Sequence, residues 1–196
     1  RNKRSISLDI KSKKGKLILK KLLRDADVII ENSRVGTMEK LGFGYKDVKK
    51  INPKIIYCSI SGFGTTGPYA KRGGFDLIAQ GMSGLMSITG HKNSPPVKVG
   101  VPIADLNTGM FAMQGILSAY IHRLKNDEGQ FMEVSLLESA LAYTLYESSI
   151  YFTTGDIPEP DGSSHRLTAP YQAFKTKDGY INLGAANQSN WERLLD

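Results

Sequence analysis

The stretch DVIIENSRVGTMEKLGFGYKDVKKINPKIIYCSI, residues 27–60, contains two short apolar runs separated by two helical patterns. The runs Asp27–Glu31 and Lys54–Ile60 are rich in β-branched residues and bounded by turn residues, which predicts two buried strands. Between them, residues 35–41 and 45–51 have helical spacing and are separated by a glycine-containing turn. Strands that alternate with helices predict right-handed crossovers, and hence an α/β fold with a Rossmann-like parallel sheet and flanking helices.

Downstream of residue 60, helical and strand patterns continue to alternate, and the predicted helices are longer. Residues 61–74 are rich in glycine, and residues 75–90 have a helical periodicity that glycines interrupt. The longest helix is expected over residues 104–123, with apolar side chains along one side. A strand over residues 129–135 and a second long helix over residues 136–154 complete this unit.

Three regions are expected along the chain. Residues 1–154 form part of a large Rossmann-like domain, and residues 155–166, which are polar and contain prolines, form a linker. Residues 167–196 begin a smaller α+β domain with a hairpin across Lys177–Gly179 and a helix from Gln188. We expect the chain to be truncated at both ends, because it opens directly into a strand-like pattern and stops when the second domain has barely begun.

Positive charge is concentrated at the N-terminal end of the chain. Residues 1–50 contain 15 basic and 6 acidic residues, whereas the whole chain carries a net charge of +7. Ser5–Asp9 alternates like a strand, and Ser12–Leu23 has apolar residues on one helical face and lysines on the other. The asymmetry predicts an anionic ligand near this third of the chain, or alternatively a solvated basic helix face over Lys11–Lys21.

Several classes of protein do not fit the sequence. Nucleic-acid binding is not expected, since there is neither zinc-finger spacing nor arginine interleaved with aromatic residues. No run of 18 apolar residues exists, so no membrane span is expected. The lone cysteine, Cys58, lies in an apolar run and is expected to be a core thiol in a reducing compartment. We therefore expect a cytoplasmic location, or the mitochondrial matrix in a eukaryote.

The residues fit none of three common kinds of catalytic or cofactor site. Gly62–Gly67 matches the dinucleotide pattern G-x-G-x-x-G after a predicted strand, but Pro68 follows where a helix should begin, and no acidic residue stands about 20 positions on. A nicotinamide or flavin site is therefore not expected. The three histidines form no recognisable triad, and no G-x-S-x-G elbow is present. No metal site is expected, because His and Cys residues lack ligand spacing.

Asp105 is the acidic residue of most interest. It follows the apolar run Val101–Ala104 and lies near the start of the longest predicted helix. One interpretation makes it the N-cap of that helix. The other makes it a nucleophile, since backbone N–H groups at a helix start favour an ionised carboxylate and apolar neighbours partly remove its water.

Seven motifs occur in one order between residues 2 and 105. They are Asn2-Lys-Arg-Ser5, Ala26-Asp-Val-Ile-Ile-Glu-Asn32, Leu41-Gly-Phe-Gly-Tyr45, Asn52-Pro-Lys-Ile-Ile-Tyr57, Ser59-Ile-Ser-Gly-Phe-Gly64, Thr66-Gly-Pro-Tyr69 and Gly100-Val-Pro-Ile-Ala-Asp105. Together they resemble class III CoA-transferases of the CaiB/BaiF type, and the resemblance runs over essentially the whole chain. This family includes formyl-CoA and succinyl-CoA transferases and a racemase branch that acts on 2-methylacyl-CoA.

The resemblance implies transfer of coenzyme A from an acyl-CoA thioester to a free carboxylic acid. Asp105 matches the family's catalytic aspartate, whose carboxylate forms a mixed anhydride with the acyl group and then an aspartyl-CoA thioester. CoA enters as part of the substrate. The resemblance leaves the acid open among succinate, oxalate, formate, carnitine-like and aromatic acids.

The resemblance also assigns binding residues and a partner. The acyl pocket is implied at Gly73, Phe75 and Asp76, where a racemase of this family would have a histidine in place of Phe75. The family forms interlocked homodimers. A non-catalytic module that binds CoA or dimerises is the alternative from outside this class of enzyme. The residues that match the family's CoA contacts are Leu8, Lys11, Asn32, Ser33, Thr37, Lys40 and Leu41.

Overall fold

A computed structural model describes all 196 residues of the chain. Its central element is a three-stranded sheet with the order β1 (Val28–Glu31), β2 (Ile56–Ser61) and β3 (Phe131–Ser135). Both pairs of strands are parallel, with Val28 opposite Ile56 and Tyr57 opposite Phe131. The α/β class and the parallel Rossmann-like sheet expected from residues 27–60 are confirmed.

One face of the sheet is covered by the helix that precedes β1 and by the two helices of the first crossover. The helices are α1 (Lys13–Arg24), α2 (Thr37–Leu41) and α3 (Tyr45–Ile51). Ser12 caps α1, because its hydroxyl accepts the N–H of Gly15 at 3.0 Å. The helices bury a cluster formed by Leu23, Met38, Phe43, Val48, Ile55 and Tyr57.

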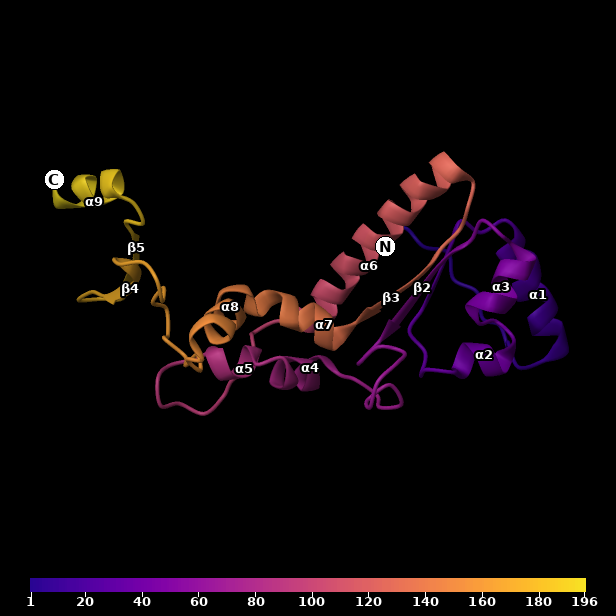
Figure 1. Cartoon of the computed structure of the whole chain (residues 1–196), viewed down its shortest axis with the longest axis horizontal. Helices are drawn as coiled ribbons and strands as arrows, with labels where there is room; N and C mark the ends of the chain where they lie inside the picture. The colour runs from indigo at the N-terminus through magenta and orange to yellow at the C-terminus, as the bar shows by residue number, and fades with distance from the viewer.

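The opposite face of the sheet is covered by the long helix α6 (Ile103–Asn126), which contacts β2 and β3. Successive strand residues point to opposite faces, so Phe131 packs beside Tyr57 on the α3 side while Met132 points to α6. Gly115 of α6 lies against the Met132 side chain, where a Cβ atom would clash. Figure 1 shows α6 running diagonally above the sheet.

Shorter helices gather at the end of β2 and β3. They are α4 (Asp76–Met82), α5 (Leu85–Ile88), α7 (Leu136–Leu141) and α8 (Leu145–Thr154), with a 3₁₀ turn at Ala142–Thr144 between the last two. The helix expected over residues 75–90 is thus broken, because Gly84 adopts φ +87°. The single helix expected over residues 136–154 is broken at the 3₁₀ turn.

The C-terminal region is an antiparallel hairpin, β4 (Tyr171–Lys175) and β5 (Tyr180–Gly184), followed by α9 (Gln188–Leu195). These elements agree with the predicted hairpin and helix. Figure 1 shows them at the opposite end of the molecule from α1, α2 and α3. The boundaries of the predicted domains remain a prediction.

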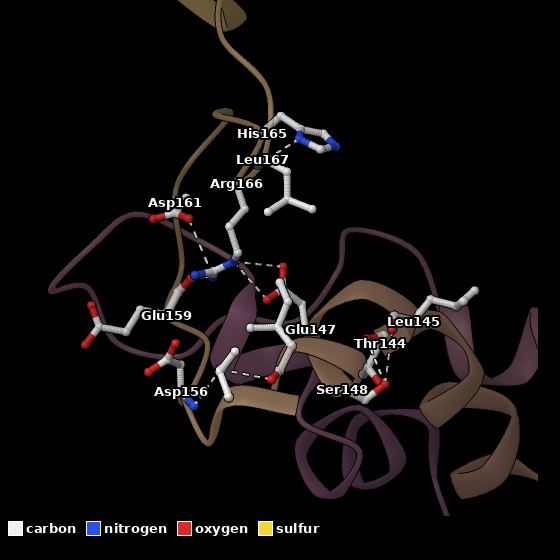
Figure 2. A network of polar contacts seen from close by, with 12 residues as sticks. Thr144, Leu145, Glu147, Ser148, Asp156, Glu159, Asp161, His165, Arg166 and Leu167 are labelled. Atoms are coloured by element: carbon white, nitrogen blue, oxygen red, sulfur yellow. Dashed lines mark hydrogen bonds and ion pairs between the residues drawn. The ribbon is translucent and has the colours of Figure 1, made fainter. Parts of the chain in front are cut away.

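A network of polar contacts holds the predicted linker against α8. The guanidinium of Arg166 lies 2.9 Å from the carboxylate of Glu147 on α8 and 3.5 Å from that of Asp161. Arg166 also donates a hydrogen bond to the backbone carbonyl of Glu159. Figure 2 shows the side chain reaching from the linker to Glu147. The linker is therefore an irregular segment, and Arg166 at its end joins it to α8.

The strand expected over Ser5–Asp9 is wrong. These residues pair with no other strand, and Ile6 is 63% exposed. Alternation detects an extended segment, but a strand also requires the backbone of a neighbour, which this segment lacks. At its end, the carbonyl of Asp9 accepts hydrogen bonds from Ser12 and leads into α1.

No helix of the structure combines the length and the apolar character that crossing a membrane would require.

Candidate active site

A cavity of about 490 Å³ opens at the carboxyl ends of the three parallel strands. Each strand contributes to its wall. Asn32 and Ser33 directly follow β1, Ser61 ends β2, and Leu136 directly follows β3. Ligands of open α/β sheets bind at this edge, because the loops and helix N-termini that follow parallel strands converge there. The N-terminal end of α6 reaches the same wall with Asp105.

Asp105 is the third residue of α6 and lies in its first turn. The interpretation of Asp105 as N-cap is wrong, since Pro102 occupies that position. The helix begins at Ile103, one residue earlier than predicted. Its side chain makes no hydrogen bond or ion pair and faces the cavity. Burial raises the pKa of this carboxyl, and the nearby charge of Asp76 raises it further.

Asp76 performs the capping role instead, from a different helix. One oxygen of its carboxylate accepts the backbone N–H groups of Ala104 at 2.8 Å and Asp105 at 3.4 Å. The other oxygen accepts the side-chain amide of Gln80 at 2.7 Å. Gln80 is fully buried, and its carbonyl accepts the N–H of Val99 at 2.8 Å. These contacts connect α4 to the start of α6 and so set the place of Asp105.

The strand end beside Asp105 is held by two further contacts. Asn32 donates from its side chain to the backbone carbonyl of Ile60 at 2.8 Å, which joins the ends of β1 and β2. The N–H of Ser33 donates to the carboxylate of Glu31 at 2.8 Å. Because their neighbours hold Asn32 and Ser33 in place, these residues form a rigid rim of the cavity.

The glycine-rich segment closes the cavity by a direct backbone contact. A Cβ atom on Gly62 would lie 2.5 Å from the Cα of Gly74, so both residues must lack side chains for the two segments to touch. The next helix, α4, starts only at Asp76. The helix that a dinucleotide fingerprint requires directly after its third glycine is therefore missing, in agreement with the expectation from Pro68.

We expect Gly74→Ala to reduce activity through this contact. The added methyl group would push the loop that carries Phe75 and Asp76 away from Gly62, and overpacking of this kind typically costs about 1–3 kcal/mol. The expected results are a lower melting temperature and a fall in kcat of about tenfold or more. Thermal unfolding and steady-state kinetics measure both. Gly100→Ala is the matched control, because nothing lies within 4 Å of a Cβ there and Gly100 does not line the cavity. Equal effects of the two changes would contradict the steric explanation.

Six of the predicted site residues meet in this cavity, namely Asn32, Ser33, Gly73, Phe75, Asp76 and Asp105. The remaining predicted CoA contacts do not line it. Leu8 and Lys11 lie just before α1, and Thr37, Lys40 and Leu41 lie on α2. Their role in binding stays a prediction.

The cavity also contains residues that the sequence analysis missed. Arg34 and Arg72 line it, as do Thr108 and Gly109 on the first turns of α6. Each arginine is adjacent in sequence to a predicted site residue, Ser33 or Gly73, which is a signal that could have been used. Thr108 and Gly109 follow Asp105 by three and four residues, so the helical repeat places them on the same face.

The family model described as CoA-transferase family III matches residues 1–196. The chain belongs to this family. Among curated relatives, the chain is 41% identical to the succinate–glutarate CoA-transferase of Agrobacterium fabrum, over 100% of this chain and 49% of the relative. It is 43% identical to the succinyl-CoA:glutarate CoA-transferase of Homo sapiens, over 100% of this chain and 45% of the relative.

The fold of the chain is also similar to that of a solved structure. The crystal structure of a CaiB/BaiF family protein from Brucella suis superposes with a TM-score of 0.87 at 38% identity, and the match covers 97% of this chain and 50% of the other. The chain thus spans about half the length of the relatives that it matches. The resemblance inferred from the motifs is confirmed at the level of the family.

Proposed function

We propose that the protein transfers coenzyme A from an acyl-CoA thioester to a free carboxylic acid, with Asp105 as the nucleophile. The observation that supports this most directly is the position of Asp105. Its carboxylate faces the cavity at the start of a long helix and makes no hydrogen bond or ion pair, while Asp76 takes over the capping of the helix. A carboxylate that faces a cavity and makes no hydrogen bond or ion pair within the protein can react with a bound ligand.

The proposed exchange forms and breaks one bond at each step. The Asp105 carboxylate attacks the carbonyl carbon of the acyl-CoA and releases CoA thiolate, which leaves a mixed anhydride. The thiolate attacks the aspartyl carbonyl and releases the first acid as its carboxylate, which leaves an aspartyl-CoA thioester. The acceptor carboxylate opens this thioester to a second anhydride, and CoA thiolate then attacks the acceptor acyl carbon and releases Asp105. No oxidant, reductant or net proton is required.

The glycines of the cavity leave room for these groups beside Asp105. Nothing lies within 4 Å of a Cβ built on Gly73 or Gly109. Gly109 lies one helical turn beyond Asp105, so the space in front of the carboxylate is free of side chains from its own helix. A thioester carbonyl can approach through this space. Covalent catalysis of this kind divides one difficult exchange into easier steps.

We propose that the CoA phosphates bind toward the basic N-terminal region. The predicted contacts Leu8, Lys11, Thr37, Lys40 and Leu41 lie along the chain that leads to and from β1. Asn32 and Ser33, at the end of β1, join these segments to the cavity. Lys11 and Lys40 are exposed and make no ion pair, so both are free to contact phosphate.

We propose a dicarboxylic acid as the acid substrate. The two curated relatives described above are named for succinate and glutarate, and the cavity wall of this chain contains two arginines. Racemisation is the less favoured activity, because Phe75 occupies the position of the family's proton-exchanging histidine and cannot exchange a proton. Phe75 is 76% exposed at the cavity wall.

We also propose that the protein is a homodimer. Six apolar residues form a stripe at helical spacing on α6, each between 47% and 70% exposed. A contiguous apolar stripe of this length is unfavourable in water, so another surface is expected to cover it. Sedimentation of the full-length protein tests the dimer. The residues of the stripe are Leu106, Met110, Met113, Leu117, Ile121 and Leu124.

The experiment for the activity uses the full-length protein and succinyl-CoA that is radiolabelled in its CoA part. Incubation of this donor with glutarate is expected to yield labelled glutaryl-CoA. Hydroxylamine added during turnover should convert Asp105 to the hydroxamate, which peptide mass spectrometry detects. Without acyl-CoA, no hydroxamate should form. Absence of labelled product with any dicarboxylic acid, or a CoA adduct on a different residue, would overturn the proposal and favour a module that binds CoA without catalysis.

A further inference from the structure

Two cationic side chains line the cavity, Arg34 and Arg72, and neither makes an ion pair or a side-chain hydrogen bond within the chain. Arg1, Arg4 and Arg24 are also unpaired, but none of them lines this cavity, and the arginines with the strongest contacts elsewhere are paired. Arg123 pairs with Asp27, and Arg166 pairs with Glu147. A guanidinium that faces a cavity without an anionic partner is suited to accept one from a ligand.

The guanidinium of Arg72 is held in place by an aromatic side chain. Its central carbon lies 4.3 Å from the centre of the Tyr69 ring, and Tyr69 packs on Phe63 with 5.7 Å between the ring centres. The backbone turn is closed by a hydrogen bond of 2.8 Å from the N–H of Arg72 to the carbonyl of Tyr69. Stacking uses the face of the guanidinium and leaves its N–H groups free at the edge, where a carboxylate binds with two parallel hydrogen bonds.

A short segment of chain joins Arg72 to Asp76, which contacts the backbone of Asp105. Gly74, two residues on, is fixed against Gly62, and Asp76, four residues on, accepts the backbone N–H of Asp105. Four residues of extended chain span at most about 14 Å. The position of Arg72 relative to Asp105 is thus set by a short, anchored segment.

We propose that Arg72 binds the distal carboxylate of a dicarboxylic acid or dicarboxylyl-CoA while the proximal carboxyl group reacts at Asp105. This inference rests on the proposed function and adds the residue that selects the substrate. Arg34 is the less suitable of the two arginines, since it follows Asn32 and Ser33 at the end of β1, on the side where the CoA contacts are predicted. Arg72 instead adjoins Gly73 and Phe75, the predicted acyl pocket.

The test compares two acceptors of equal length in the full-length protein, glutarate and pentanoate, with succinyl-CoA as the common donor. Pentanoate lacks only the distal carboxylate, so effects on the donor cancel in the ratio of the two kcat/KM values. Arg72→Gln is expected to lower the ratio of glutarate to pentanoate by about 10- to 100-fold, as for loss of a charge-assisted hydrogen-bonded pair. Most of this change should be in the KM for glutarate.

Control variants separate selection from a general structural role. Lys71→Gln removes a neighbouring charge that does not line the cavity and should leave the ratio within about twofold. Tyr69→Leu should lower the ratio and Tyr69→Phe should not, because phenylalanine keeps the stacking face.

Three outcomes would overturn the inference. The first is an equal loss of transfer to both acceptors in Arg72→Gln. The second is a change of the ratio in Arg34→Gln and not in Arg72→Gln. The third is a wild-type protein that shows no preference for glutarate. A wild-type protein that transfers CoA to neither acid would overturn this inference together with the proposed function.

Discussion

Replacement of Asp105 by alanine is expected to lower kcat/KM for CoA transfer by at least about 10⁴-fold, because the nucleophile that forms every covalent intermediate is removed. Isotope exchange from labelled acid into acyl-CoA is the most sensitive measurement. The loss should be the same for every pair of acids, since all of them pass through the same carboxylate. Asp105→Asn should lose a similar factor, because the amide is a poor nucleophile of nearly identical shape.

Binding and stability should survive this substitution. The affinity for CoA, measured by calorimetry, should change by less than about threefold, since the predicted contacts to the nucleotide lie elsewhere. The pKa of Asp105 is raised in the folded protein, so between the unfolded and the folded pKa the folded state binds more protons than the unfolded state, and stability falls as pH rises through that window. Above it, ionised Asp105 disfavours folding. Asp105→Asn should therefore melt at an equal or higher temperature than the wild type at pH 7.

Two results would count against the role of Asp105. Transfer at more than about one-hundredth of the wild-type rate in Asp105→Ala would show that another group reacts. A large fall in melting temperature at pH 7 would show that Asp105 has a structural function that the geometry does not reveal.

Replacement of Asp76 by alanine is expected to have the second largest effect, through position and not through contact with the reacting atoms. It removes the acceptor for the N–H groups of Ala104 and Asp105 and for the amide of buried Gln80. An unsatisfied donor costs about 1–3 kcal/mol, so a loss of stability of about 2–4 kcal/mol is expected. A displaced α6 start should lower kcat about 100-fold, because misplacement by about 1 Å has that effect.

Asp76→Asn is a partial control, since its carbonyl oxygen can still accept the two backbone N–H groups, whereas its NH₂ group cannot accept the side-chain amide of Gln80. It should lose less stability and less kcat than Asp76→Ala. It also removes the negative charge that contributes to the raised pKa of Asp105. The acid limb of the pH profile of kcat/KM, where Asp105 becomes protonated, should therefore move to lower pH and still lie above the ordinary range of aspartate, because burial is the larger cause. An unchanged acid limb would contradict this account of the shift.

Most elements of the fold follow from local patterns. The strands at Val28–Glu31 and Ile56–Ser61 lie within two residues of their predicted bounds, because short β-branched runs between turn residues have few alternatives. The strand expected over Ser5–Asp9 failed because alternation does not say whether a partner strand is present. The helix predicted over residues 75–90 breaks at Gly84, which adopts a left-handed conformation. The periodicity indicated an interruption there but not a break into two helices.

The candidate site was predicted less evenly. Asp105 was found because apolar neighbours and a helix start have a recognisable chemical meaning. The function of Asp76 was described only as part of an acyl pocket, since nothing in the local sequence shows that its carboxylate would cap a helix 29 residues away. Arg72 was missed because an exposed arginine in a polar loop is ordinary until its surroundings are known.

By itself, the sequence determined the alternation of strands and helices, the parallel sheet and the membership of the family, because these depend on periodicity and on ordered motifs along the chain. Only the tertiary structure decided which side chains share one cavity. Asp76 and Asp105 meet because the second crossover returns α4 and α6 to the same edge of the sheet, and Arg72 faces that edge because Gly74 packs on Gly62. Contacts between distant segments depend on how helices pack on the sheet, and no local pattern encodes that packing.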